Sequence, residues 1–72
     1  MLEKVVPNNY YRNIKTGDVY FVLAIAKDSE NPQAMFVCYF REQEYWVRPL
    51  ELFKQKFEED SFKRTKQPLS IS

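Results

Sequence analysis

The chain has no histidine, one cysteine (Cys38) and one glycine (Gly17) among its 72 residues. A single cysteine excludes an intrachain disulfide, and without imidazole one chain cannot form a zinc or His-based iron site. Cys38 lies in an apolar run with no histidine to make it a thiolate, so we expect an inert packing residue. One glycine cannot form a loop that cradles phosphate. We therefore expect no enzyme, no catalytic residue, no metal and no cofactor.

The charges are nearly balanced, with 11 basic and 10 acidic residues and a net charge of +1. A general nucleic-acid binder carries a stronger positive field, so a nucleic-acid partner is not expected. The one basic cluster, "FKRTK", follows "FEED", which offsets its charge. The chain has no apolar window of about 18 residues, and we do not expect its first residues, "MLEKVVPNNYY", to be a secretory leader because they contain no long apolar run. A membrane partner is therefore not expected. A lone cysteine in such a chain favours the cytoplasm.

The length predicts one domain over residues 1–72, with its core at about 10–66. Short apolar runs between turn residues predict strands at 10–14, 19–26, 34–40 and 45–49, with an edge strand over 61–66 as an open option. Gly17 lies in the first turn, where we expect a positive φ. Leu50, Phe53 and Phe57 have helical spacing after Pro49, which predicts a helix over 50–57. The predicted fold is mostly β: a small SH3-like barrel or a strongly bent antiparallel sheet with one short helix or helical turn.

The two long strands are apolar on both faces, which is unusual for a half-buried strand. Strict alternation places Val19, Phe21, Leu23 and Ile25 on one face of the first and Tyr20, Val22, Ala24 and Ala26 on the other. Met35, Val37 and Tyr39 oppose Phe36, Cys38 and Phe40 in the same way. Either the barrel is tightly closed and the helix covers its outside, or a second copy covers the exposed face. We favour the second option and expect a homo-oligomer.

The succession "YYRNIKTGDVYFVLAIAKDSE", "FVCYF" and "YWVRPLELF" resembles the DUF1653 family of small bacterial and phage proteins. The family pattern runs from tyrosine-arginine-histidine through lysine-glycine and tyrosine-x-valine to histidine-serine-glutamate, tryptophan-valine-arginine-proline and methionine-phenylalanine. In this chain the matching residues are Tyr11, Arg12, Lys15, Gly17, Tyr20, Val22, Ser29, Glu30, Trp46, Val47, Arg48, Pro49 and Phe53. Asn13 and Asp28 stand where the family has its two histidines, so a role that needs imidazole does not carry over.

The resemblance implies a small, mostly β, SH3-like fold and no established activity. Together with the lone cysteine, it leads us to expect a location in the cytoplasm of a bacterial or phage-infected cell.

The stretch "WVRP" has two interpretations. Trp46 and Arg48 are two residues apart on a predicted strand and so share a face, while Val47 points to the other face, which we predict to be the core if Trp46 and Arg48 form a ligand site. In one interpretation Trp46 belongs to the core and Arg48 pairs with Glu30 or Glu51. In the other, Trp46 and Arg48 line a ligand pocket with Arg12 as a second charge. The candidate ligand-binding residues are Tyr11, Arg12, Asn13, Asp28, Ser29, Trp46 and Arg48.

Two classes of function remain. The first is an oligomeric, non-catalytic module that binds a small anionic planar ligand such as a nucleotide. By analogy of size and architecture alone, such a module could be a phage protein that sequesters the nucleotide signals of bacterial immunity. The second is an SH3-like adaptor whose aromatic groove binds a protein segment. Dependence on Arg12 and Arg48 with a phosphate-bearing ligand favours the first, and salt-insensitive binding through aromatic residues favours the second.

Overall fold

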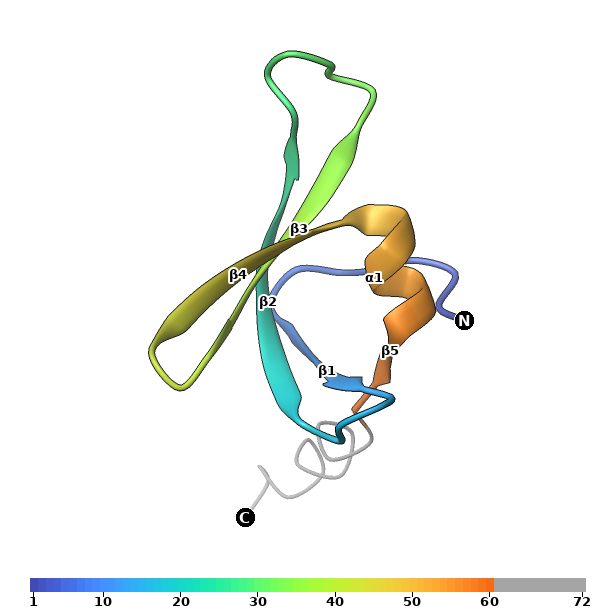
Figure 1. Ribbon diagram of the computed structural model, residues 1–72, viewed down its shortest axis with the longest axis vertical. Helices are drawn as coiled ribbons and strands as arrows, with labels where there is room; N and C mark the ends of the chain where they lie inside the picture. The colour runs from blue at the N-terminus through green and yellow to red at the C-terminus, as the bar shows by residue number, and fades with distance from the viewer. Residues whose placement is uncertain (61–72) are drawn as a thin grey trace, which may run out of the picture.

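The computed structural model describes residues 1–60 and shows five strands and one helix (Figure 1). The elements in chain order are β1 (Asn9–Asn13), β2 (Val19–Lys27), β3 (Met35–Arg41), β4 (Glu44–Pro49), α1 (Leu50–Lys56) and β5 (Phe57–Glu59). The predicted strands over 10–14, 19–26, 34–40 and 45–49 are confirmed, with bounds shifted by one residue at most at each end. The predicted helix is also confirmed, with Pro49 as its N-cap residue and Phe57 as its C-cap residue.

All five strands form one antiparallel sheet in the order β4-β3-β2-β1-β5. The sheet bends strongly, and α1 connects β4 at one end of the order to β5 at the other (Figure 1). The two outer strands do not pair, so the sheet does not close. The prediction of a mostly β fold is confirmed as a bent, unclosed sheet with one short helix.

The strand connections follow from their turn residues. Gly17 has a φ of 83°, as predicted, and its N–H donates to the Asn13 carbonyl in the turn between β1 and β2. The turn between β3 and β4 has two central residues, Glu42 and Gln43, both with positive φ. This is the two-residue geometry whose twist matches that of the flanking strands. The hairpin of β2 and β3 projects beyond the rest of the molecule as an arm (Figure 1).

One face of the sheet, here called the inner face, carries the core. The buried side chains are Tyr11, Val22, Val37, Tyr39, Phe53 and Phe57. Phe53 and Phe57 lie one helical turn apart and stack with ring centroids 4.0 Å apart and planes 3° apart. Tyr39 meets both rings edge-on. A few large aromatic side chains thus fill the core of a very short chain.

A β-bulge corrects the predicted faces of β2. The register shifts between Val22 and Ala24, so Leu23 is an extra residue without a direct partner. After this residue the alternation reverses, and Ile25 joins Val22 on the inner face while Ala24 lies opposite Cys38 on the other face. The assignment of Ala24 to the face of Val22 was therefore wrong. Alternation predicts faces only in a strand without a bulge.

Two further predictions concern the end of the chain and the membrane. The edge strand suggested over 61–66 lies outside the described residues. A different edge strand, β5, comes directly after the helix and pairs with β1. Within residues 1–60, the single helix is too short to cross a membrane.

Candidate functional site

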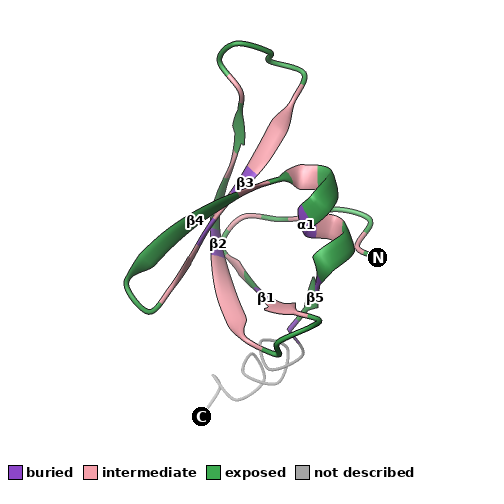
Figure 2. Cartoon of the chain, in the orientation of Figure 1, coloured by how far each residue is buried: buried purple, intermediate pink, exposed green. Residues whose placement is uncertain are grey.

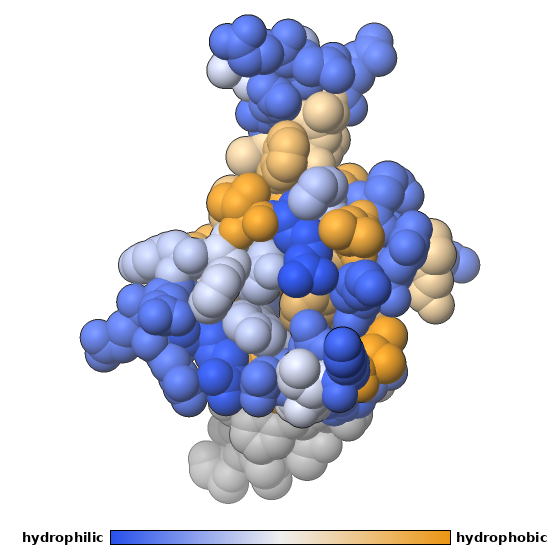
Figure 3. Space-filling model, viewed as in Figure 1, coloured by the Kyte–Doolittle hydropathy of each residue, from blue (hydrophilic) through white to orange (hydrophobic). Residues whose placement is uncertain are grey.

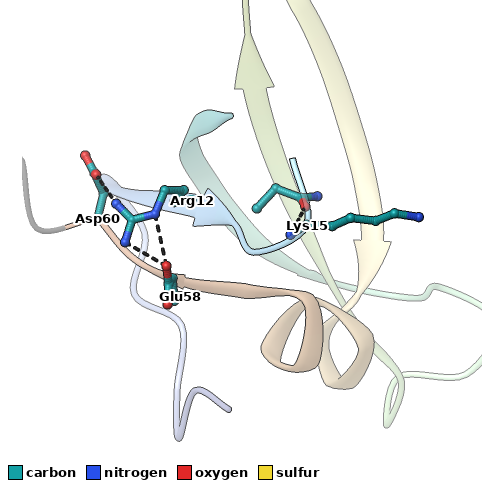
Figure 4. A network of polar contacts seen from close by, with 5 residues as sticks. Arg12, Lys15, Glu58 and Asp60 are labelled. Atoms are coloured by element: carbon teal, nitrogen blue, oxygen red, sulfur yellow. Dashed lines mark hydrogen bonds and ion pairs between the residues drawn. The ribbon is translucent and has the colours of Figure 1, made fainter. Parts of the chain in front are cut away.

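Arg12 connects β1 to the end of β5. Its Nε and Nη2 donate to Glu58 Oε2 at 3.0 and 2.7 Å, and its Nη1 donates to Asp60 Oδ1 at 3.1 Å (Figure 4). Asp60 is buried, and its other oxygen, Oδ2, has no hydrogen-bond partner among residues 1–60. A buried carboxylate needs a cation beside it, and Arg12 supplies that cation. The guanidinium is therefore already engaged by two carboxylates within the chain.

The polar candidates Asn13 and Asp28 each stabilise a local turn. Asn13 Oδ1 accepts the N–H groups of Lys15 and Thr16 at 2.9 and 3.1 Å. Asp28 Oδ1 accepts the N–H of Glu30 at 2.8 Å, and Ser29 beside it is exposed. The two turns lie at opposite ends of β2 (Figure 1). The structure thus does not bring Asn13 together with Asp28 and Ser29.

Tyr11 lies in the core, in edge contact with Phe53 at 5.7 Å between ring centroids. Its hydroxyl accepts the N–H of Val6 at 2.9 Å and so fixes the N-terminal segment against the sheet. The side chain is almost fully buried. It can support a site, but a ligand on the surface cannot reach it.

The structure does bring Trp46 and Arg48 together on the inner face of β4. Trp46 lies opposite Tyr39 and Arg48 opposite Val37, and both of those partners are buried core residues. The Arg48 guanidinium carbon lies 5.6 Å from the centre of the Phe57 ring, a cation–π arrangement. Trp46 is 45% exposed. The aromatic ring and the guanidinium form a half-exposed strip along the open side of the sheet, here called the Trp46–Arg48 strip.

Val47 corrects the predicted orientation of β4. Its side chain is 63% exposed and lies opposite Cys38 on the outer face of the sheet. The prediction that Val47 packs inward was wrong, because the core lies on the side of Trp46 and Arg48. The interpretation of Trp46 as a core residue also fails, since this strand lies at the edge of the sheet and the ring is only half covered.

Arg48 differs from the other arginines that the structure describes. Arg12 pairs with Glu58 and Asp60, and Arg41 pairs with Asp18 and Glu42. Within residues 1–60, Arg48 makes no ion pair, so the predicted alternative pairing with Glu30 or Glu51 is absent. Its donors remain available to an anionic group. Arg12 projects from the opposite face of the sheet, because it follows inward-facing Tyr11 in β1.

Sequence reasoning missed a second surface, on the outer face. A hollow of about 370 Å³ is lined by Tyr10, Val19, Phe21, Phe40, Arg41 and Glu42. Tyr10 and Phe21 meet edge-on at 5.1 Å between centroids, and Phe40 contacts Tyr45 at 5.0 Å. Arg41 is neutralised by its two carboxylates, so the hollow offers aromatic walls without a free cation. The signal in the sequence was the second apolar face of the strands, which indicated a contact surface but not its shape.

The residues that the structure describes contain no cluster of acidic, cysteine or histidine side chains that could hold a metal ion. The fold and the two surfaces define a small β domain that displays aromatic and arginine side chains on a bent, unclosed sheet. The chain belongs to the family described as "Protein of unknown function (DUF1653)", whose model matches residues 9–66. The resemblance seen in the sequence is thus confirmed. No curated protein and no solved structure matches the chain.

Proposed function

We propose that the protein is a non-catalytic binding module that holds a small anionic planar ligand at the Trp46–Arg48 strip. The observation that carries the proposal is the state of Arg48, which lies over Phe57 and has no carboxylate partner among residues 1–60. Its planar fork matches phosphate or carboxylate in a bidentate manner. Trp46 beside it supplies a flat surface on which a ring can stack.

A nucleotide combines the two features that the strip matches, a planar base and an anionic phosphate. A protein that binds such a ligand without transforming it acts by holding it. Sequestering a nucleotide signal in a bacterial or phage-infected cell is the corresponding biological role within this proposal. Arg12 is not part of the proposed site, since Glu58 and Asp60 occupy it on the other face.

The test is calorimetry with adenosine monophosphate, with adenosine as the uncharged comparison. We expect binding of the monophosphate and weaker binding of adenosine, because Arg48 contacts the phosphate. Arg48→Ala should cost about 2–4 kcal/mol of binding free energy, the range for a central contact. Arg48→Lys should also weaken binding, because it keeps the charge but loses the planar fork.

The matched control is Arg41→Lys. Arg41 also lies over an aromatic ring, 5.8 Å from the centre of Tyr20, but it is engaged by Asp18 and Glu42. This variant should bind as the wild type does. If both Arg48 variants bind as tightly as the Arg41 control while remaining folded, the strip is not the ligand site. Native mass spectrometry of protein purified from its own cells would then show whether any ligand is retained.

The outer hollow favours the second candidate, an adaptor for a protein segment. Its aromatic walls and balanced charges suit an apolar side chain better than an anion. Binding of this kind should be insensitive to salt and should be reduced by Tyr10→Ser but not by Arg48→Ala. The two candidate functions thus differ in the residue on which binding depends and in the salt dependence of binding.

A further inference from the structure

Strand β4 has one unpaired edge. It is the last strand in the sheet order, and no other strand of residues 1–60 pairs with its free side. Most of its length is exposed (Figure 2), and Tyr45 is 74% exposed. The surface around this strand in Figure 3 is mixed, with pale side chains of intermediate hydropathy beside hydrophilic and hydrophobic ones. Edge strands are often protected from pairing by lysine, by a bulge or by inward charges. The strand "EYWVRP" has no lysine and no register shift against β3, and its two inward charges, Glu44 and Arg48, have opposite signs.

The turn geometry determines which backbone N–H and C=O groups of β4 point to its free edge, away from β3. Arg41 and Glu44 flank a two-residue turn, so they form the hydrogen-bonded pair that closes the hairpin. Bonded and non-bonded pairs then alternate along the ladder. The backbone groups of Trp46 and Arg48 accordingly face β3, and those of Tyr45 and Val47 face the free edge. Pro49 also faces outward, where its missing N–H costs the β3–β4 ladder nothing.

Only one antiparallel register pairs all the N–H and C=O groups with which Tyr45 and Val47 face the free edge. Pairing Tyr45 with Val47 of a second copy forms four backbone hydrogen bonds, two at each end of a twofold axis. A shift that places Val47 opposite itself would pair Tyr45 with Pro49, which has no N–H to donate. A shift in the other direction would place residues of the turn in the ladder. The backbone therefore favours the register centred on Trp46.

The side chains match themselves in this same register. Glu44 lies opposite Arg48 of the second copy, and Arg48 opposite its Glu44, with the two Trp46 side chains facing each other between them. These three residues share the inner face, because they are two apart along the strand. On the outer face, Tyr45 lies beside Val47 of the second copy, an aromatic and β-branched pair that favours a sheet. A single strand thus carries both charges in the order that its own antiparallel copy requires.

We propose that two copies of this chain pair through their β4 edges in antiparallel fashion, with the twofold axis at Trp46 and reciprocal Glu44–Arg48 ion pairs. The two bent sheets then continue into one ten-stranded sheet. Arg48 has five N–H donors. The glutamate of the second copy takes one edge of the guanidinium and leaves the other edge to a ligand. The pairing does not depend on the proposed ligand, and it brings two Trp46–Arg48 strips side by side.

The experiment is sedimentation equilibrium over about 10–500 µM. An interface formed by one short strand from each copy is small, and small interfaces give weak dimers. The wild type should give twice the chain mass of 8.7 kDa at the upper end. Glu44→Lys places a lysine opposite Arg48 and should weaken the dimer roughly 10- to 100-fold. Glu30→Lys makes the same charge change in the exposed loop of the arm and should leave the dimer intact. The charge swap Glu44→Arg with Arg48→Glu should restore it.

A second variant tests the backbone. Val47→Pro removes an outward N–H and should weaken the dimer while leaving the β3–β4 hairpin folded, which far-UV circular dichroism checks. The proposal is overturned if the wild type has the mass of one chain throughout, if Glu44→Lys behaves as Glu30→Lys does, or if the charge swap fails to restore association. A monomeric wild type that binds an extended peptide along β4 would also overturn it. Calorimetry with adenosine monophosphate on the same samples reports the ligand separately, so the two proposals fail independently.

Discussion

Replacing Arg12 with alanine should destabilise the protein because it removes the one cation that pairs with buried Asp60 among residues 1–60. The Arg12 side chain is 31% exposed and that of Asp60 only 3% exposed. Removing one partner of a fully buried ion pair costs about 3–5 kcal/mol. An exposed pair is worth about 0–1 kcal/mol. With one partner buried and the other partly exposed, we expect Arg12→Ala to lower the free energy of unfolding by about 2–3 kcal/mol.

Arg41→Ala is the matched control for this prediction. The Arg41 side chain is 32% exposed, nearly the same as that of Arg12, but its partner Asp18 is 42% exposed. Its loss should therefore cost no more than about 1 kcal/mol. The two arginine variants differ mainly in whether the orphaned carboxylate can reach water. Thermal unfolding should show a fall in Tm of roughly 10–20 °C for Arg12→Ala and a much smaller fall for the control.

The same reasoning predicts coupling between Arg12 and Asp60. Asp60→Asn removes the buried charge, so combining it with Arg12→Ala should cost less than the sum of the two single changes, by about 1–2 kcal/mol. All samples need one protein concentration, because association raises apparent stability. Equal Tm values for Arg12→Ala and Arg41→Ala, or strictly additive effects in the double variant, would refute the structural role of Arg12.

Phe53→Ala should cost about 3–5 kcal/mol of unfolding free energy in urea titrations, because the ring is fully buried against Tyr11, Tyr39 and Phe57. Leu52→Ala, one residue away on α1 and 39% exposed, should cost under about 1 kcal/mol, and equal losses would show that the helix presents a different face. Cys38→Ser should leave ligand binding unchanged and lower stability by roughly 1 kcal/mol, since the thiol is half-buried on the outer face opposite Val47. Loss of binding by folded Cys38→Ser protein in calorimetry would instead indicate a reactive thiol.

Local features of the fold follow from the sequence. Gly17 predicted a positive φ because a residue without Cβ adopts it at little cost. Pro49 predicted the junction of strand and helix, since proline cannot donate to a ladder but suits a helix start. The spacing of Phe53 and Phe57 predicted one buried face of α1. Each of these features depends on residues that lie close together in the sequence.

Other features required the tertiary structure. The bulge at Leu23 reverses the faces of β2, and nothing in "VYFVLAIAK" marks it, because every residue near it is apolar. Strand β5 has three residues and is stabilised by pairing with β1, so its own sequence does not predict a strand.

The candidate site shows the same division. Sequence spacing placed Trp46 and Arg48 on one face, as the structure does, because alternation along one regular strand is local. Which of the two faces carries the core was decided by the packing of β4 against β3, and Val47 was therefore assigned to the wrong side. Arg12 meets Glu58 and Asp60 across a separation of 46 and 48 residues. The sequence alone determined the strands, the turns and the residues that alternate together, and the tertiary structure alone decided which face is covered and which charge is already paired, because both depend on contacts between distant segments.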